Sequence, residues 1–152
     1  MKIFIDDERI PPRGEEADWV IVRDPKAAFA ILHANSAHIT HISFDNDLGF
    51  ETEGRDIMQQ VLLGTPVTRP VPFPRLEAIY VHSANTVAAQ AMLDLAASGK
   101  KSGIIRKEVI IEGHSALYEK YQTFSSWYDE AYEAESERLD GLNDLRLDEH
   151  FL

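Results

Sequence analysis

The sequence predicts an α/β fold built on a parallel sheet, and three observations support this prediction. Short runs rich in β-branched and aromatic residues alternate with segments that repeat apolar residues at helical spacing. Most of the intervening segments are long enough for the crossover helix that parallel strands require. The chain has 152 residues, which is enough for one substantial hydrophobic core and too few for two.

Four strands and three helices are predicted in the first two thirds of the chain. The strands cover residues 2–6, 19–23, 39–45 and 77–83. A helix capped by Asp24 follows the second strand, a helix from about residue 54 to Gly64 follows the third, and a helix capped by Asn85 follows the fourth and ends near residue 99. Residues 7–18 include two adjacent prolines and are too few for a full helix, so we expect a loop or a single turn there.

The last third of the chain has a different pattern. Residues 104–112 are predicted to form a fifth strand, and a long helix is predicted from about Ser115. Residues 140–152 form either more helix or an acidic tail that frays. We therefore expect an α/β domain over residues 1–113 and a C-terminal helical extension over residues 114–152. The extension carries an apolar stripe, which we expect to pack on the sheet of the same domain or on a partner chain, including a second copy: Leu117, Tyr121, Phe124, Tyr128 and Ala131.

Composition excludes several classes of function. The chain has no cysteine, so disulfides, thiolate metal sites and cysteine nucleophiles are excluded. The net charge is −11, with 26 acidic and 15 basic residues, which argues against a surface that binds duplex nucleic acid. No apolar run approaches the roughly 20 residues that a membrane-spanning helix needs. We expect a soluble cytoplasmic protein without a membrane partner.

Polar side chains follow three of the predicted strands. Because parallel strands place their carboxyl ends at one edge of the sheet, these residues are expected to converge there. Clustered carboxylates raise one another's pKa unless a cation lies between them, and an all-oxygen site suits Mg²⁺ or Mn²⁺. An isolated acid after a strand is more often a helix cap, but three polar strand ends favour a shared metal or phosphate site. The residues are Asp6 and Asp7, then Asp45, Asn46 and Asp47, then His82, Ser83 and Asn85.

The order of these motifs resembles a known family. The segments at 5–9 (IDDER), 43–49 (SFDNDLG), 54–56 (GRD) and 81–85 (VHSAN), together with Trp19, resemble the receiver domains of two-component signalling. They are more similar to a divergent branch, the cyclic-phosphate-processing receiver-like domains, over roughly residues 1–97. The resemblance implies a flavodoxin-like three-layer sandwich with a parallel sheet and a reduced or missing first helix. The C-terminal helix is an addition to that pattern.

The resemblance also implies roles for individual residues. Asp6 and Asp7 become metal-binding acids, and Asp45 takes the position of the phosphoacceptor or a metal ligand. Asn46 stands where the family often has histidine. Receivers carry a lysine at the end of strand five, and Lys107 is its nearest candidate here. Ser83 takes the position of the phosphate-contacting hydroxyl, and His82 is an addition specific to the branch. Judged from the residues themselves, Arg9 either binds a phosphate or only neutralises Asp6 and Asp7. His82 is either a general acid–base group or phosphate contact, or a buried histidine that donates to a backbone carbonyl. We also assign Asn85 to phosphate contact and Asp47 to the metal.

Three functions remain open from the sequence. The first is a metal-dependent phosphoesterase acting on a small phosphorylated ligand, namely a cyclic-phosphate end, a cyclic nucleotide or a cyclic oligonucleotide. The second is a signalling receiver that is phosphorylated on Asp45 and uses the C-terminal helix as its output surface. The third is a non-catalytic nucleotide-binding protein or an acidic interaction protein. The presence of His82 and the lack of a clear strand-five lysine favour the first.

Overall fold

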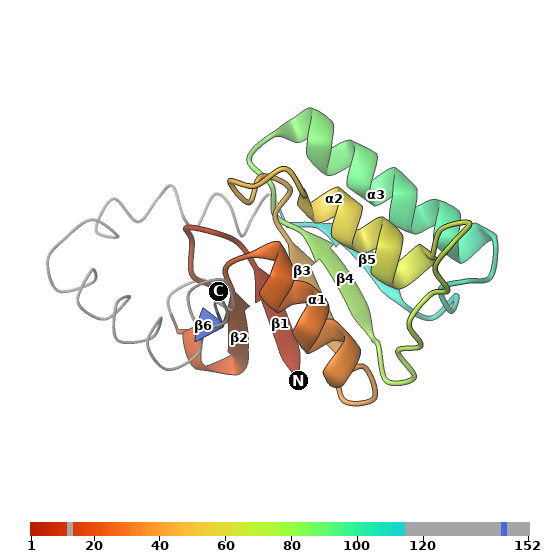
Figure 1. The fold of residues 1–152 in the computed structure, drawn as a ribbon, viewed down its shortest axis with the longest axis horizontal. Coiled ribbons are helices and arrows are strands. Elements are labelled where there is room, and N and C mark those ends of the chain that lie inside the picture. Colours follow the sequence, from red (N-terminus) through yellow and green to blue (C-terminus); the bar gives the residue numbers. More distant parts are fainter. Residues whose placement is uncertain (12–13, 115–143, 146–152) are drawn as a thin grey trace, which may run out of the picture.

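A parallel sheet forms the centre of the protein in a computed structural model, which describes residues 1–11, 14–114 and 144–145 (Figure 1). The strand order is β5-β4-β3-β1-β2-β6, and every neighbouring pair is parallel. The order of the first five strands is that of a flavodoxin-like sheet, which confirms the predicted fold class. The strands are β1 (Lys2–Ile5), β2 (Trp19–Val22), β3 (His41–Phe44), β4 (Ala78–Val81), β5 (Ile110–Gly113) and β6 (Asp144–Leu145).

Three helical segments lie next to one another on one face of the sheet (Figure 1). They are α1 (Pro25–Ala34), α2 (Gly54–Ile57), which continues as the π-helix η2 (Met58–Leu63), and α3 (Thr86–Lys101). The predicted caps are confirmed, because Asp24 accepts a hydrogen bond from the Ala27 N–H and Asn85 accepts one from the Ala88 N–H. Among the described residues between β1 and β2, the one helical element is the short 3₁₀ turn η1 (Glu16–Asp18), as the short proline-containing segment predicts.

The two faces of the sheet carry different side chains, because successive residues of a strand point to opposite sides. Ile3, Ile5, Ile42 and Phe44 belong to the large core that packs against the three helices. The opposite face carries a smaller buried cluster, whose members are Phe4, Ile10, Trp19 and Ile21, with Tyr80 packed against it. Strands β1 to β4 are therefore largely buried on both faces, which explains their nearly continuous apolar sequence, whereas β5 is mostly exposed.

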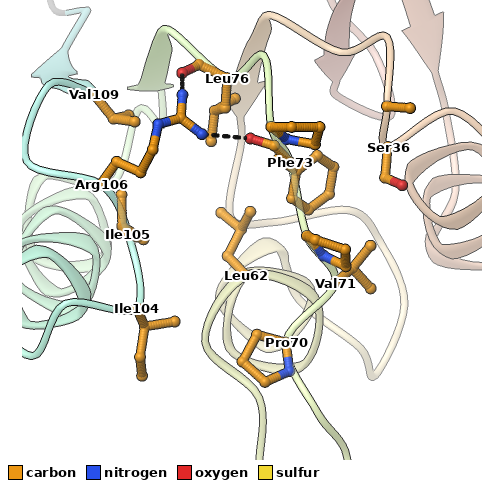
Figure 2. A pocket seen from close by; sticks show the side chains of 13 residues that line it. Ser36, Leu62, Pro70, Val71, Phe73, Leu76, Ile104, Ile105, Arg106 and Val109 are labelled. Atoms are coloured by element: carbon orange, nitrogen blue, oxygen red, sulfur yellow. Dashed lines mark hydrogen bonds between the residues drawn. The ribbon is translucent and has the colours of Figure 1, made fainter.

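The structure corrects the prediction for the fifth strand. Only Ile110–Gly113 pair with β4, whereas residues 104–109 form the loop that precedes β5. The guanidinium of Arg106 holds this loop, since it donates to the carbonyl oxygens of Phe73 (2.9 Å) and Leu76 (2.6 Å) (Figure 2). The β-branched run predicted a strand, but these side-chain bonds and a turn at Gly103, where φ is +84°, give a loop.

Two further points concern the C-terminal third of the chain. The predicted helix from Ser115 and its apolar stripe lie outside the described residues. Within residues 140–152, Asp144–Leu145 form strand β6 beside β2, which is neither of the two predicted alternatives. No helix in the described part of the chain is long and apolar enough to cross a membrane.

Candidate metal and phosphate site

The predicted acidic residues converge at the carboxyl edge of the sheet. Asp6 directly follows β1, and Asp45 directly follows β3, its neighbour in the sheet. Asp6, Asp7 and Asp45 each place one carboxylate oxygen so that the three oxygens lie within 4.8 Å of one another. This spacing brings together oxygen ligands from two adjacent strands, as the sequence predicts.

A cavity of about 370 Å³ opens at this cluster. Seven of the predicted site residues line it: Asp6, Asp7, Arg9, Asp45, Asp47, Ser83 and Asn85. Asn46, which the sequence placed among the converging strand-end residues without a role, also lines it, and Glu8, Glu53 and Ala84, which were not predicted, complete the wall. The lining is strongly acidic, with hydroxyl, amide and guanidinium groups on its rim.

Asp6 is held by hydrogen bonds to both of its carboxylate oxygens. Oδ1 accepts from the backbone N–H groups of Glu8 and Arg9, each at 2.8 Å, and Oδ2 lies 3.1 Å from Nε2 of His82. Burial alone raises the pKa of this carboxyl group, but the hydrogen bond from His82, together with the two backbone donors, outweighs it and lowers the pKa. Asp6 is therefore a fixed anion at the base of the cavity.

Asp45 has the opposite protonation behaviour. Its burial and the nearby negative charge of Asp6 raise the pKa of Asp45 from 3.8 to about 7, although the charge of Arg9 and the Asn46 N–H oppose this shift. Burial and the charges of Asp6 and Glu8 also raise the pKa of Asp7. The ionised forms of Asp45 and Asp7 are thus disfavoured at this site. A bound cation would favour them.

The loop after β3 is fixed by Asn46, to which sequence analysis gave a place at the strand end but no role. Its side chain donates to Glu53 Oε2 (3.2 Å) and accepts from the Arg55 N–H (3.2 Å). Gly54 lies directly against this loop, and a Cβ atom at that position would be 1.9 Å from the Asp45 carbonyl oxygen. The Glu53–Asp56 capping box was the sequence signal that this loop ends in an ordered helix start.

Arg23 is a second residue that sequence analysis missed. Its side chain is buried, and NH1 donates to the carbonyl oxygens of Asp6 and Arg9. It therefore holds the backbone that carries Asp6, Asp7 and Arg9. A charged residue that ends an otherwise apolar strand was the available signal, because a buried cation must find partners.

His82 lies beneath the cavity and does not line it. The ring is fully buried, stacks on Phe4 with a centroid distance of 4.3 Å and an interplanar angle of 8°, and contacts Asp6 through Nε2. Its other nitrogen, Nδ1, is 2.7 Å from the Ser43 hydroxyl. The structure thus places His82 behind Asp6 and outside the cavity lining, as in the alternative of a buried histidine, and its role as a general acid–base group stays a prediction.

Lys107 and Asp47 also differ from their predicted positions. Lys107 lies in the loop before β5, next to Arg106, and this loop is at the amino edge of the sheet. The assignment of Lys107 to phosphate binding is therefore wrong in this structure, because the strand it was placed on begins only at Ile110. Asp47 lines the cavity but is exposed, accepts from the Gly49 N–H at 3.0 Å and does not belong to the three-oxygen cluster.

A second cavity, of about 560 Å³, lies at the amino edge of the sheet (Figure 2). Prolines and aliphatic side chains line it, and Leu62, Phe73 and Ile105 form part of its wall. Arg106 is on this wall, with its guanidinium directed to the two backbone carbonyls. No carboxylate is among its lining residues, so the acidic chemistry belongs to the carboxyl edge.

The fold and the acidic cavity together define a receiver-type α/β domain. Its strand order, its reduced first helix and its carboxylates after β1 and β3 are the features that place it in this class. The family described as the cyclic-phosphate processing receiver domain matches residues 1–98, and the chain belongs to this family. Comparisons with curated proteins and with solved structures give no significant match.

Proposed function

We propose that this protein is a metal-dependent phosphoesterase that processes a cyclic phosphate. The observation that carries the proposal is the meeting of the Asp6, Asp7 and Asp45 oxygens within 4.8 Å, at a cavity in a domain of this family. The substrate class, a cyclic-phosphate end or a cyclic nucleotide or oligonucleotide, rests on the family description. The alternatives are phosphorylation of Asp45 and binding without turnover.

The donor set of the site fits a hard divalent cation. All three clustered ligands are carboxylate oxygens, and burial and the neighbouring negative charges together raise the pKa values of Asp7 and Asp45. Such a site suits Mg²⁺ or Mn²⁺, held by Asp6, Asp7 and Asp45, with Asp47 at the rim. Bound there, a divalent cation would stabilise charge on a phosphoryl oxygen and lower the pKa of a bound water, while the three carboxylates would hold it.

Three side chains of the protein would contact the phosphate. The Arg9 guanidinium, the Ser83 hydroxyl and the Asn85 amide lie on the wall of the same cavity and offer N–H and O–H donors. Arg9 is also 3.6 Å from Asp6 Oδ2, so it neutralises part of the acidic charge while it faces the cavity. These three residues would orient the phosphate, and Asp6 would remain a fixed anion.

The position of Lys107 argues against the signalling alternative. A receiver that accepts a phosphoryl group uses a strand-five lysine near the acids, and Lys107 lies at the opposite edge of the sheet. Asp45 is also buried, with 6% of its surface exposed. The phosphoesterase is therefore the better supported of the two.

A mass-spectrometric assay tests the proposed function. The protein is incubated with an oligonucleotide that ends in a 2′,3′-cyclic phosphate, and separately with cyclic mononucleotides and cyclic oligonucleotides, with Mg²⁺, with Mn²⁺ or with a chelator. We expect ring opening or phosphate release that needs the cation. Asp45→Asn should abolish it, and Asp94→Asn, the same change on the exposed side of α3, should not. A parallel incubation with a small phosphoryl donor such as acetyl phosphate, in which Asp45 takes the phosphoryl group and acetate leaves, would instead support signalling. Unchanged ligands across the panel would contradict the enzyme.

A further inference from the structure

A buried polar chain runs from the middle of the sheet to the acidic cavity. Ser43 on β3 contacts His82, which follows β4, and His82 contacts Asp6, which follows β1. The two distances are 2.7 Å and 3.1 Å, and each of the three residues has at most 1% of its surface exposed. This row of hydrogen-bonded side chains therefore links three neighbouring strands beneath the cavity.

The hydroxyl group of Ser43 is a buried polar group on a strand of apolar residues. Its neighbours on the strand, Ile42 and Phe44, are apolar and point to the helix-covered face, whereas Ser43 points to the other face. A polar atom in such a place costs free energy unless it is hydrogen-bonded, and its partner in the structure is His82 Nδ1. An apolar side chain at position 43 would satisfy the packing of the sheet, whereas the imidazole of His82 requires a hydrogen-bond partner there.

We infer that Ser43 is a positioning residue for the acidic site and acts through His82 on Asp6. A hydroxyl that donates to Nδ1 leaves the ring proton on Nε2, and the Nε2–H then donates to Asp6 Oδ2. The stacked Phe4 ring fixes the plane of the imidazole, so the direction of this donation is fixed too. Ser43 touches no ligand, and neither it nor His82 lines the cavity.

The effect on Asp6 follows from the other bonds of its carboxylate. Oδ1 is already held by two backbone N–H groups, and His82 holds Oδ2, so both oxygens have defined directions before a ligand arrives. Without the Nε2–H donor, Oδ2 would lose its buried partner and the carboxylate could rotate. This inference extends the proposed function, because it matters for catalysis only if Asp6 binds the cation.

The first measurement does not depend on any ligand. The ¹⁵N shifts of the imidazole nitrogens report which one carries the proton, and His82→Gln identifies the His82 signals among the six histidines. We expect the Nε2–H tautomer in the wild type, a changed or mixed tautomer in Ser43→Ala, and the wild-type tautomer in Ser43→Thr, which keeps a hydroxyl. An unchanged tautomer in Ser43→Ala would overturn the inference, whether or not the protein binds a metal.

The second measurement uses Mn²⁺ alone, with binding followed by electron paramagnetic resonance. Loss of an outer-shell partner typically weakens metal binding about 10–100-fold. We expect Ser43→Ala to weaken Mn²⁺ binding by at least about tenfold and Ser98→Ala, a hydroxyl removal on α3, to leave it unchanged. Wild-type affinity in Ser43→Ala would overturn the inference. Absence of Mn²⁺ binding in the wild type would overturn the proposed metal site instead, and the tautomer measurement would then decide the inference.

Discussion

At the scale of single residues, Asp45 links the stability of the fold to pH. Its pKa in the folded protein is about 7, against 3.8 ordinarily, so between these values the native state binds more protons than the unfolded state. The stabilising contribution of Asp45 is therefore fully present below pH 4 and is lost as pH rises through 7. The slope is at most about 1.4 kcal/mol per pH unit for this one group.

This predicts a difference between the wild type and Asp45→Asn in chelator-containing buffer. Denaturant unfolding measured from pH 4 to pH 8 should show the free energy of unfolding of the wild type falling relative to that of the variant. The asparagine has no carboxyl group to titrate, so its curve should lack this component. Parallel curves over the whole range would mean that Asp45 ionises at its ordinary pKa in the folded protein.

Gly54 is the second residue whose role can be tested singly. A Cβ atom there would lie 1.9 Å from the Asp45 carbonyl oxygen, and backbone cannot move aside as a flexible side chain can. We expect Gly54→Ala to lower the free energy of unfolding by about 1–3 kcal/mol or to displace the loop that carries Asp45. Thermal unfolding measures this, with the exposed neighbour Arg55→Ala as the control. Equal melting temperatures for Gly54→Ala and the wild type would contradict the close approach.

At the scale of elements, the cap of α1 gives a quantitative prediction. The buried Asp24 side chain accepts from the Ala27 N–H at 2.8 Å. Removal of an N-cap acceptor typically costs about 0.5–2 kcal/mol, so Asp24→Ala should lower the free energy of unfolding by about that amount. Asp24→Ser should retain most of the stability because serine is also a good cap. Urea unfolding distinguishes them, and equal losses in both variants would show that charge or packing at position 24 matters more than the cap.

The elements also show what local sequence can predict. The caps at Asp24 and Asn85 and the missing first helix follow from residues close together in the chain, and they were predicted. The loop at residues 104–109 depends on bonds from Arg106 to carbonyls about thirty residues away, so the local β-branched pattern was misleading. Strand β6 is two residues long and depends on pairing with β2 far away in the sequence. The acids of the site were predictable because the carboxyl ends of parallel strands share one edge of the sheet. The burial of His82 behind Asp6 was not predictable, because sequence periodicity does not say which side chains lie between the cavity and the core.

At the scale of the whole molecule, a cation that binds only the native state should stabilise the entire fold. At 100 times the dissociation constant, this linkage adds about 2.7 kcal/mol. Millimolar Mg²⁺ or Mn²⁺ should therefore raise the melting temperature, and Asp45→Ala should abolish the rise. Differential scanning calorimetry over a range of cation concentrations measures it, and a wild-type curve that stays constant across that range would argue strongly against the metal site.

The sheet topology sharpens the prediction for the apolar stripe of the C-terminal third. Strands β5 and β6 lie at opposite edges of the sheet, and the three described helices occupy one face. A right-handed crossover from β5 back to β6 runs in the opposite direction to that from β2 to β3, so it should cross the other face, which carries Phe4 and Trp19. We therefore expect the stripe of Leu117, Tyr121, Phe124 and Tyr128 to pack there rather than on a partner chain.

Substitutions in the stripe test this expectation. Leu117→Asp or Tyr121→Asp should lower the melting temperature substantially in a monomeric sample, because a charge would replace a buried apolar side chain. Glu119→Gln, a conservative change between these positions, should have little effect. A wild-type dimer that the same substitutions dissociate without loss of stability would place the stripe on a partner chain.

The charges that line the acidic cavity predict the order in which a cation and a phosphate would bind. Six carboxylates surround it, those of Asp6, Asp7, Glu8, Asp45, Asp47 and Glu53, and among the lining residues Arg9 alone carries a positive side chain. A phosphate that approaches this cavity without a cation meets a repulsive potential, whereas a divalent cation is attracted to it. Cation and phosphate should therefore bind in sequence, the cation first, and the association rate of the phosphate should increase with cation concentration until the site is filled. In the proposed reaction, the same repulsion would drive a phosphorylated product out whenever the cation leaves.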